Sequence, residues 1–352
     1  MHALFRGLVL LSVATPVAFA LDSASDFFHG LPKHSKNHRR MRSGLDSSPT
    51  WLMTDDYCKE DFLNDFTFEA IPDPTEGRVT YVDKDTAIAH NLTECTADSF
   101  IMRADSTTVL DPAGPGRESI RIQSKKQWTK GVFVLDLKHM PVGCGTWPAY
   151  WMTQTEGWPE NGEIDVLEGV NDIIPNRSAL HTKNNCSITT PPSLLTGTVS
   201  STNCSYLYNF NEGCAVMWNS QPNSYAQPLN TIGGGWFVTE RTDHSFSVWF
   251  WGRNDENVPP AVKLGLPMIC TKDFGEPVAY WESSSTCDFS QMFGPHNIII
   301  NLTLCGSWAG QDNVFQGAGC PGTCVDYVNS QPAKFKDAYW DIKSLKVYSK
   351  TY

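Results

Sequence analysis

Three acidic residues stand close together in the most informative stretch of the sequence, which runs from Trp158 to Asn171. Side chains alternate between the two faces of a β-strand, so Glu163 and Asp165 share one face of a short apolar strand. Glu168 would point the other way in a regular strand, but one extra residue in a bulge just before it returns it to the acidic face. The spacing therefore predicts three carboxyl groups side by side on one bulged strand.

Carboxyl groups gathered in this way point to one kind of acid–base chemistry. Repulsion between like charges raises the pKa of at least one carboxyl and keeps that group protonated near neutral pH. A protonated acid beside an ionised carboxylate is what glycoside hydrolysis needs, and its retaining form requires the two groups about 5–5.5 Å apart. A calcium site or a structural acid cluster is the alternative, although Val166 and Leu167 interrupt the oxygen-rich spacing of a calcium loop.

Aromatic residues lie just upstream of the acidic residues and favour the first interpretation. Sugar rings present flat C–H faces that pack on an indole ring, and Trp147, Trp151 and Trp158 supply three such rings. Trp147 and Trp151 are four residues apart and share a strand face, although any single Trp is about as often part of a core. His181 follows one strand later and could reach the same surface, although a lone His is more often structural.

The rest of the chain supplies the strands that must position these groups. Short alternating segments separated by Gly, Pro and Asn have strand character, without a βαβ rhythm. These segments are Arg78 to Val82, Ser119 to Gln123, Val132 to Leu137, Phe246 to Trp251, Asn297 to Leu304 and Ala338 to Tyr348. In the last of them the alternation slips at Ser344, as a bulge would cause, and Cys324 to Ser330 is the clearest helical segment. The pattern predicts an all-β protein, one antiparallel β-sandwich or jelly roll.

Composition and charge narrow the class of protein. The 352 residues have a formal net charge of −11, whereas a protein that binds nucleic acid through its phosphates is normally basic. Repeated apolar stretches of about 20 residues, which a polytopic membrane protein needs, do not occur. Twelve Trp and 18 Phe require a large aromatic core, an aromatic-lined binding site, or both. We assign Trp147, Trp151 and Trp158 to a site, and Trp249, Trp251 and Trp340 at least partly to a core.

The chain divides at two points. Arg6, the apolar stretch Leu8 to Phe19 and the small residues at 18 and 20 are typical of a secretory signal peptide, which we place at residues 1–20. Residues 21–50 are polar and locally basic, so we expect a linker or propeptide. No further break in composition follows, which predicts a single catalytic domain over residues 51–352 of a secreted protein.

Cysteine usage agrees with an oxidising compartment. All eleven Cys lie beyond the signal peptide, and an odd number leaves at least one of them unpaired. The pairing cannot be derived from the sequence. Cys320 and Cys324 alone are a weak hint of zinc, and the absence of paired CxxC motifs or an HExxH motif predicts no metal site.

Five sequons for N-glycosylation place several loops at the surface. They begin at Asn91, Asn176, Asn185, Asn203 and Asn301. Asn301 lies inside the apolar run Ile298 to Leu304, so we expect it to be the buried and unmodified one.

The segment Gly162-Glu-Ile-Asp-Val-Leu-Glu-Gly169 resembles the E-x-D-x-x-E signature of glycoside hydrolase family 16 in its bulged, laminarinase-type form. Further blocks are similar to those of fungal endo-β-1,3(4)-glucanases, so that the resemblance covers essentially all of residues 51–352. These blocks are Phe66 to Phe68, Pro72 to Thr75, Tyr81 to Asp83, Gly143 to Trp151, Leu180 to Thr182, Ile232 to Gly235, Cys305 to Gly310 and Ala338 to Tyr348.

The resemblance implies a concanavalin A-like jelly roll whose curved sheet forms an open cleft, and a secreted, retaining endo-β-glucanase acting on β-1,3 or mixed β-1,3/1,4 glucans. Glu163 would be the nucleophile and Glu168 the general acid/base, with Asp165 hydrogen-bonded to the nucleophile. The side chains lining the sugar site would be Trp147, Trp151, Trp158, His181 and Trp308. We expect a monomer with a polysaccharide substrate and no cofactor, and composition and charge favour neither nucleic acid nor membrane as a partner.

Two other functions stay open from the sequence. A cell-wall transglycosylase would pass the sugar from the enzyme to another glucan, although such crosslinkers of the family have the shorter E-x-D-x-E motif. A non-catalytic glucan-binding protein would usually lack one of the three carboxylates, and all three are present here.

Overall fold

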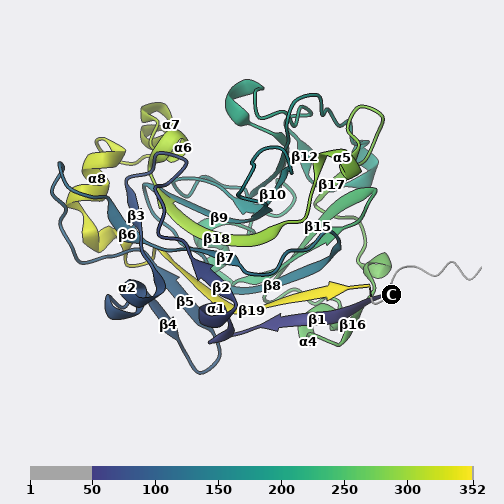
Figure 1. Ribbon diagram of the computed structural model, residues 1–352, viewed down its shortest axis with the longest axis horizontal. Helices are drawn as coiled ribbons and strands as arrows, with labels where there is room; N and C mark the ends of the chain where they lie inside the picture. Colours follow the sequence, from purple (N-terminus) through teal and green to yellow (C-terminus); the bar gives the residue numbers. More distant parts are fainter. Residues whose placement is uncertain (1–49, 351–352) are drawn as a thin grey trace, which may run out of the picture. The chain divides into compact units, whose positions relative to one another are not determined.

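Two antiparallel sheets face each other across a shared apolar core in the computed structural model, which describes residues 50–350 (Figure 1). The predicted signal peptide and almost all of the predicted linker therefore lie outside the described residues. The predicted all-β fold is confirmed, because the two sheets form the body of the described chain and its helices have at most seven residues.

The first sheet has nine strands in the part of the chain that the structure describes. Its main path runs β16-β1-β19-β8-β14-β15-β17, while β5 joins β19 and β4 joins β5. The strands are β1 (Trp51–Tyr57), β4 (Thr93–Cys95), β5 (Phe100–Arg103), β8 (Gly131–His139), β14 (Gly235–Arg241), β15 (Ser245–Gly252), β16 (Met268–Ile269), β17 (Ala279–Glu282) and β19 (Tyr339–Ser349). The register of β19 against β8 shifts on either side of Ile342, so the predicted slip near Ser344 is a bulge.

The second sheet has eight described strands in the order β12-β13-β11-β10-β9-β18-β7-β2. These are β2 (Phe66–Phe68), β7 (Arg121–Ser124), β9 (Thr146–Thr153), β10 (Glu163–Glu168), β11 (Arg177–His181), β12 (Thr198–Val199), β13 (Cys214–Met217) and β18 (Asn297–Leu304). Figure 1 shows β18 bent into a U whose open side faces away from the nine-stranded sheet. The acidic strand β10 lies between β9 and β11 near the middle of this curved sheet.

One predicted strand is wrong in detail. The segment Ser119 to Gln123 is two strands, because β6 (Arg117–Ser119) pairs in parallel with β3 (Val79–Tyr81) and β7 pairs with β18 and β2. Ile120, between the two strands, is buried and packs in the core. The change of pairing partner at Ile120 is a tertiary effect that alternation of residue types does not reveal.

Strand alternation explains which face of the curved sheet is apolar. On β18 the even-numbered Ile298 and Ile300 enter the core between the sheets, while Asn297 and Asn301 lie on the opposite face. Ile164 of β10 and Leu180 of β11 enter the same core. Burying each of these side chains contributes about 1.5–3 kcal/mol. The core strands therefore fix the direction in which the polar side chains of β10 and its neighbours point.

A second apolar cluster covers the far side of the nine-stranded sheet. It contains Trp249 and Trp251, whereas Trp340 is fully buried in the main core, so all three Trp assigned to a core are found there.

Short helices connect the strands. They are α1 (Asp61–Asn64), α2 (Lys84–Ala89), α3 (Ala226–Thr231), α4 (Pro260–Leu264), α5 (Phe289–Met292), α6 (Gly306–Ala309), α7 (Asp312–Gly317) and α8 (Cys324–Ser330). The last is the predicted helix, and its N-cap residue Thr323 accepts a hydrogen bond from the Asp326 N–H. Within residues 50–350 no helix is both long and apolar enough to cross a membrane.

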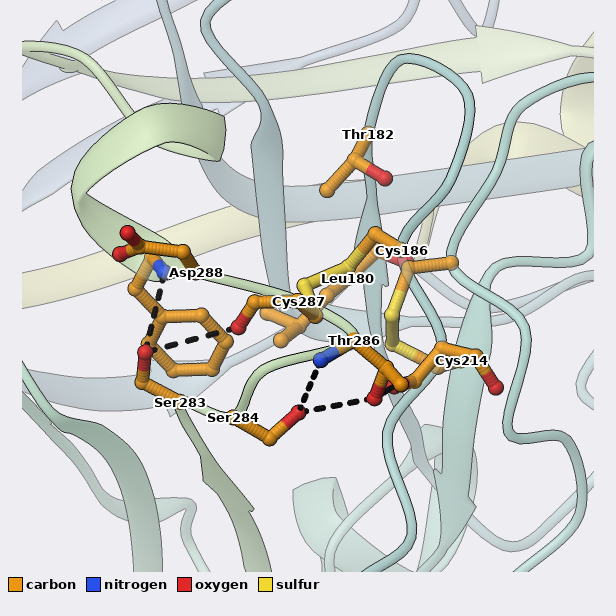
Figure 2. The surroundings of a disulfide bond; sticks show 12 residues. Leu180, Thr182, Cys186, Cys214, Ser283, Ser284, Thr286, Cys287 and Asp288 are labelled. Atoms are coloured by element: carbon orange, nitrogen blue, oxygen red, sulfur yellow. Dashed lines mark hydrogen bonds between the residues drawn. A yellow bond between two sulfur atoms is a disulfide. The ribbon is translucent and has the colours of Figure 1, made fainter.

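Four disulfides are present in the described chain. They are Cys144–Cys320, Cys186–Cys287, Cys204–Cys214 and Cys305–Cys324. Cys320 and Cys324, which hinted weakly at zinc, thus belong to two different disulfides. Cys58, Cys95 and Cys270 are free, in agreement with the odd number of Cys. Figure 2 shows Cys186 and Cys287 joining the loop after β11 to the turn before α5.

Candidate active site

The acidic strand β10 contains the predicted bulge. Asp165 lies opposite Ala179 of β11, and the next pair joins Glu168 to Arg177. This is three residues further along β10 but only two along β11, so β10 has one extra residue. The register against β9 shifts at the same place. The bulge returns Glu168 to the face that Glu163 and Asp165 occupy.

A buried asparagine holds the bulge in shape. Asn176 donates its Nδ2–H to the Val166 carbonyl at 3.0 Å, and its Oδ1 accepts the Glu168 N–H at 3.1 Å. Ser178 donates to the same Val166 carbonyl at 2.7 Å. Asn176 is fully buried, and both ends of its amide are occupied, which leaves no room for a glycan at this sequon. Asn301 is buried as expected, but the burial of Asn176 was not predicted.

Asn176→Ala is expected to lower the free energy of unfolding by about 2–3 kcal/mol, because it removes two hydrogen bonds and leaves the buried Glu168 N–H unpaired. Denaturant unfolding measures this loss. Alanine at the exposed Asn254 is the control and should change stability by less than about 0.5 kcal/mol. Equal stabilities for the two variants would contradict the role given to Asn176.

Glu163 lies under an indole ring and beside an imidazole. Trp158 donates its Nε1–H to Glu163 Oε2 at 2.8 Å, and His181 Nε2 lies 4.0 Å from Oε1. Burial, and then repulsion from Asp165, raise the pKa of Glu163 to about 8, while the His181 charge partly offsets the rise. In the absence of substrate, Glu163 therefore tends to stay protonated near neutral pH.

Asp165 is the most deeply placed of the three carboxyls, with 3% of its surface exposed. Its Oδ2 lies 3.0 Å from His181 Nε2 but lacks an aligned hydrogen-bond donor. Burial, and then repulsion from Glu168, hold the pKa of Asp165 well above its usual range. The arrangement favours a protonated Asp165 beside an ionisable Glu163.

Glu168 has its own pair of partners. Trp147 donates its Nε1–H to Glu168 Oε1 at 3.0 Å, and Arg177 Nη1 lies 3.5 Å from Oε2. Trp308 packs edge-on against Trp147 with ring centroids 5.4 Å apart, and the Arg177 guanidinium lies 5.6 Å from the Trp308 ring. The two glutamates therefore each accept an indole N–H, but only Glu168 is paired with an arginine.

The predicted site residues all lie around these three carboxyls. Trp151 shares its strand face with Trp147 and donates its Nε1–H to Asn301 Oδ1 at 2.8 Å. The guanidinium of Arg121 lies 5.0 Å from the centre of the Trp151 ring. The sequence reasoning missed the partners of these groups, Arg121, Arg177, Asn211 and Asn301. Of these, Arg177 could have been predicted, because it precedes His181 by four residues and therefore lies on the same face of the strand.

Two groups of described residues could converge on a metal ion. One consists of Cys186, Cys204 and Cys287, whose sulfurs are all in disulfides. The other consists of Glu163, Asp165 and His181, whose ligand atoms lie within 4.8 Å of one another. The pairing of β10 with β11 places Glu163 opposite His181 and accounts for this second group without a metal, so we treat it as an acid–base cluster.

Known proteins resemble this chain over most of its length. The family model of the XgeA-like, catalytic GH16 domain matches residues 66–348. A protein named probable endo-1,3(4)-beta-glucanase from Aspergillus clavatus is 38% identical over 350 residues, which are 97% of this chain and 50% of that protein. The chain thus spans about half the length of this curated relative.

Solved structures share the fold at high similarity. GH16 Laminarinase 16A from Phanerochaete chrysosporium, with two 6-O-glucosyl-laminaritriose molecules in its donor and acceptor sites, is 49% identical with a TM-score of 0.83. The match covers 86% of this chain and all of that one. An elongating GH family 16 beta-1,3-glucosyltransferase is 35% identical with a TM-score of 0.78, over 85% of this chain and all of that one.

Proposed function

The chain belongs to glycoside hydrolase family 16, and on this premise we propose that it is a secreted endo-β-glucanase that hydrolyses β-1,3 or mixed β-1,3/1,4 glucans with retention of configuration. One observation supports this most directly. The bulge in β10 puts Glu163 and Glu168 on one face, each hydrogen-bonded to an indole N–H. Two carboxyls on one face in different electrostatic settings are what a double displacement requires.

The proposed reaction has two steps. Glu163 attacks the anomeric carbon while Glu168 gives its proton to the departing glycosidic oxygen, forming a glycosyl ester on Glu163 and releasing one end of the glucan. Glu168, now ionised, then takes a proton from water. The resulting hydroxide equivalent attacks the same carbon and frees Glu163. Asp165, protonated, would donate a hydrogen bond to the ionised Glu163 and limit its charge.

The partners of the two glutamates suit these roles. Arg177 lies beside Glu168, where its guanidinium would face the carboxylate that forms when Glu168 gives up its proton. The indole N–H of Trp158 would hold Glu163 on the sugar side of the sheet. Trp147, Trp151, Trp158, Trp308 and His181 would form the sugar-binding surface, since a neutral polysaccharide needs aromatic faces and hydrogen bonds rather than a basic surface.

Extracellular action is part of the proposal. Four disulfides are consistent with an oxidising compartment, and the N-terminal residues 1–20 have the pattern of a signal peptide. We propose that residues 51–352 act as one monomeric catalytic domain without a cofactor.

Purified protein incubated with laminarin, lichenan and a β-1,4-glucan is expected to release oligosaccharides of several lengths from the first two substrates only. Internal cleavage lowers the viscosity long before complete conversion, and retention gives the β-anomer as the first product in NMR spectra. Chromatography of the early products gives the linkage preference. Wild-type protein that cleaves none of these glucans would refute the proposed function.

A transglycosylase is the second candidate, because the chain is 35% identical over 85% of its length to the elongating GH family 16 beta-1,3-glucosyltransferase. Both activities share the glycosyl-enzyme and differ in whether water or a sugar hydroxyl attacks it. Incubation with a high concentration of laminari-oligosaccharide separates them. Products longer than the substrate at early times would favour transfer, and only shorter products would favour hydrolysis.

A further inference from the structure

One surface loop contacts a neighbour of each of the three acidic residues. The loop consists of residues 205–213, which we call the 205–213 loop, and the Cys204–Cys214 disulfide joins the residues at its two ends. It belongs to neither sheet but leads into β13, the strand beside β11. The loop residues that make these contacts are Tyr206, Asn211 and Glu212.

The first contact reaches Asp165 through His181. Asn211 Oδ1 lies 2.8 Å from His181 Nδ1, and His181 Nε2 faces Asp165 Oδ2 at 3.0 Å. Both ring nitrogens therefore face an oxygen, and of the two contacts the one with Asn211 is a hydrogen bond. His181 is almost completely buried, and Asn211 fixes the rotation of its ring about the side-chain axis.

The other two contacts reach Glu168 and Glu163. The carbonyl oxygen of Glu212 accepts a hydrogen bond from Arg177 Nη2, while Nη1 of the same guanidinium faces Glu168. Tyr206 packs edge-on against Trp158 with ring centroids 5.5 Å apart, and Trp158 donates to Glu163. Each carboxyl thus has one direct partner that is itself held by the loop.

The backbone conformation of the loop lets it approach His181 closely. Asn209, Asn211 and the fully exposed Phe210 all have positive φ values, between 45° and 61°, which residues other than glycine seldom adopt. A Cβ at Gly213 would lie 2.7 Å from the Leu180 carbonyl oxygen and 2.8 Å from His181 Cε1. Only a glycine at position 213 lets the loop sit this close to His181.

Two disulfides hold the base of the loop. The sulfur atoms of Cys186, Cys204 and Cys287 lie within 4.8 Å of one another, so the Cys204–Cys214 and Cys186–Cys287 bonds are adjacent. Through Cys287 the base is tied to the turn before α5 (Figure 2). The loop therefore has covalent support while its tip makes polar contacts.

We propose that the 205–213 loop is a positioning device for the acidic residues, and that Asn211 is its principal positioning residue. The inference rests on the proposed glycosidase function, since it concerns the geometry of the same three carboxyls. Asn211 does not meet the reacting atoms but sets the orientation of His181, which lies between Glu163 and Asp165. Glu163 and Asp165 are the charged groups of β10 that face this imidazole, and Glu212 follows Asn211 in the loop.

Asn211→Gly tests the proposal, because glycine keeps the positive φ of residue 211 and removes only the amide. We expect kcat on laminarin to fall roughly 10- to 100-fold, the size of loss seen when a residue that orients a metal-binding His is replaced. KM should stay within about twofold and the melting temperature within about 2 °C, because the amide contributes neither to substrate contacts nor to the core. Asn211→Asp, which keeps an acceptor for His181 Nδ1, should recover most of kcat.

Phe210→Gly is the matched control, since Phe210 has the same backbone conformation and a fully exposed side chain. Its kcat should equal that of the wild type. Long-range ¹H–¹⁵N NMR spectra give a readout that is independent of activity. The His181 Nδ1 signal should move in Asn211→Gly and stay in place in Phe210→Gly.

Two outcomes would overturn the proposal. Wild-type kcat in Asn211→Gly would show that the contact does not position the site. A fall in kcat and melting temperature together, without recovery in Asn211→Asp, would show a merely structural role. An inactive wild-type protein refutes the proposed function instead, and the His181 spectra then still test the contact.

Discussion

Glu163→Gln is expected to lower kcat on laminarin roughly 10⁴-fold or more, because the amide cannot form the glycosyl ester and the two-step route is lost. The substitution keeps the size of the side chain and an acceptor for the Trp158 N–H, so substrate binding should survive. Steady-state rates with the reducing-end assay and calorimetric binding of a laminari-oligosaccharide measure the two effects separately. Activity within tenfold of the wild type would remove Glu163 from the role of nucleophile.

The same variant has a predicted effect on stability that changes with pH. Burial raises the pKa of Glu163 from 4.5 to about 8, so between these values the folded protein holds a proton that the unfolded chain has lost. Stability therefore falls as the pH rises through this window, and glutamine at position 163 removes that contribution. The drop in melting temperature from pH 4.5 to pH 8 should be smaller in Glu163→Gln than in the wild type. Glu256→Gln, at an exposed position, is the control and should leave the drop unchanged.

The position of the acidic face could be predicted because the strand period is strict. Glu163 and Glu168 can share a face only if a residue is inserted between them, and the register of β10 contains that insertion. The convergence of Trp147, Trp151 and His181 follows from the same alternation on β9 and β11, the strands on either side. The alternation of side chains along single strands thus predicted which residues lie directly around the carboxyls.

The contacts one step further out could not be predicted. Asn211 reaches His181 across 30 positions, and it does so from a loop whose base depends on a disulfide pairing that the sequence leaves open. Asn176 matches a glycosylation sequon, yet the bulge draws its amide into the interior. In both cases the role comes from long-range packing, and the residue type alone favours a surface position.

Glu168→Ala is expected to lower kcat on laminarin about 10²- to 10⁴-fold, because the departing sugar oxygen then leaves without a proton. An aryl β-glucoside oligomer with an acidic phenol needs little protonation, so its first step should be affected far less. Comparison of the rates on the two substrates measures both effects.

Azide distinguishes the two glutamates by stereochemistry. In Glu168→Ala the glycosyl ester on Glu163 still forms. Azide can attack this ester without a general base, because azide is already an anion. Azide then displaces Glu163 from the anomeric carbon and gives the β-glycosyl azide. In Glu163→Ala azide instead attacks the substrate directly, from the face that the carboxylate occupied, and gives the α-glycosyl azide. NMR of the azide products decides the assignment, and the opposite pair of anomers would mean that the roles of Glu163 and Glu168 are exchanged.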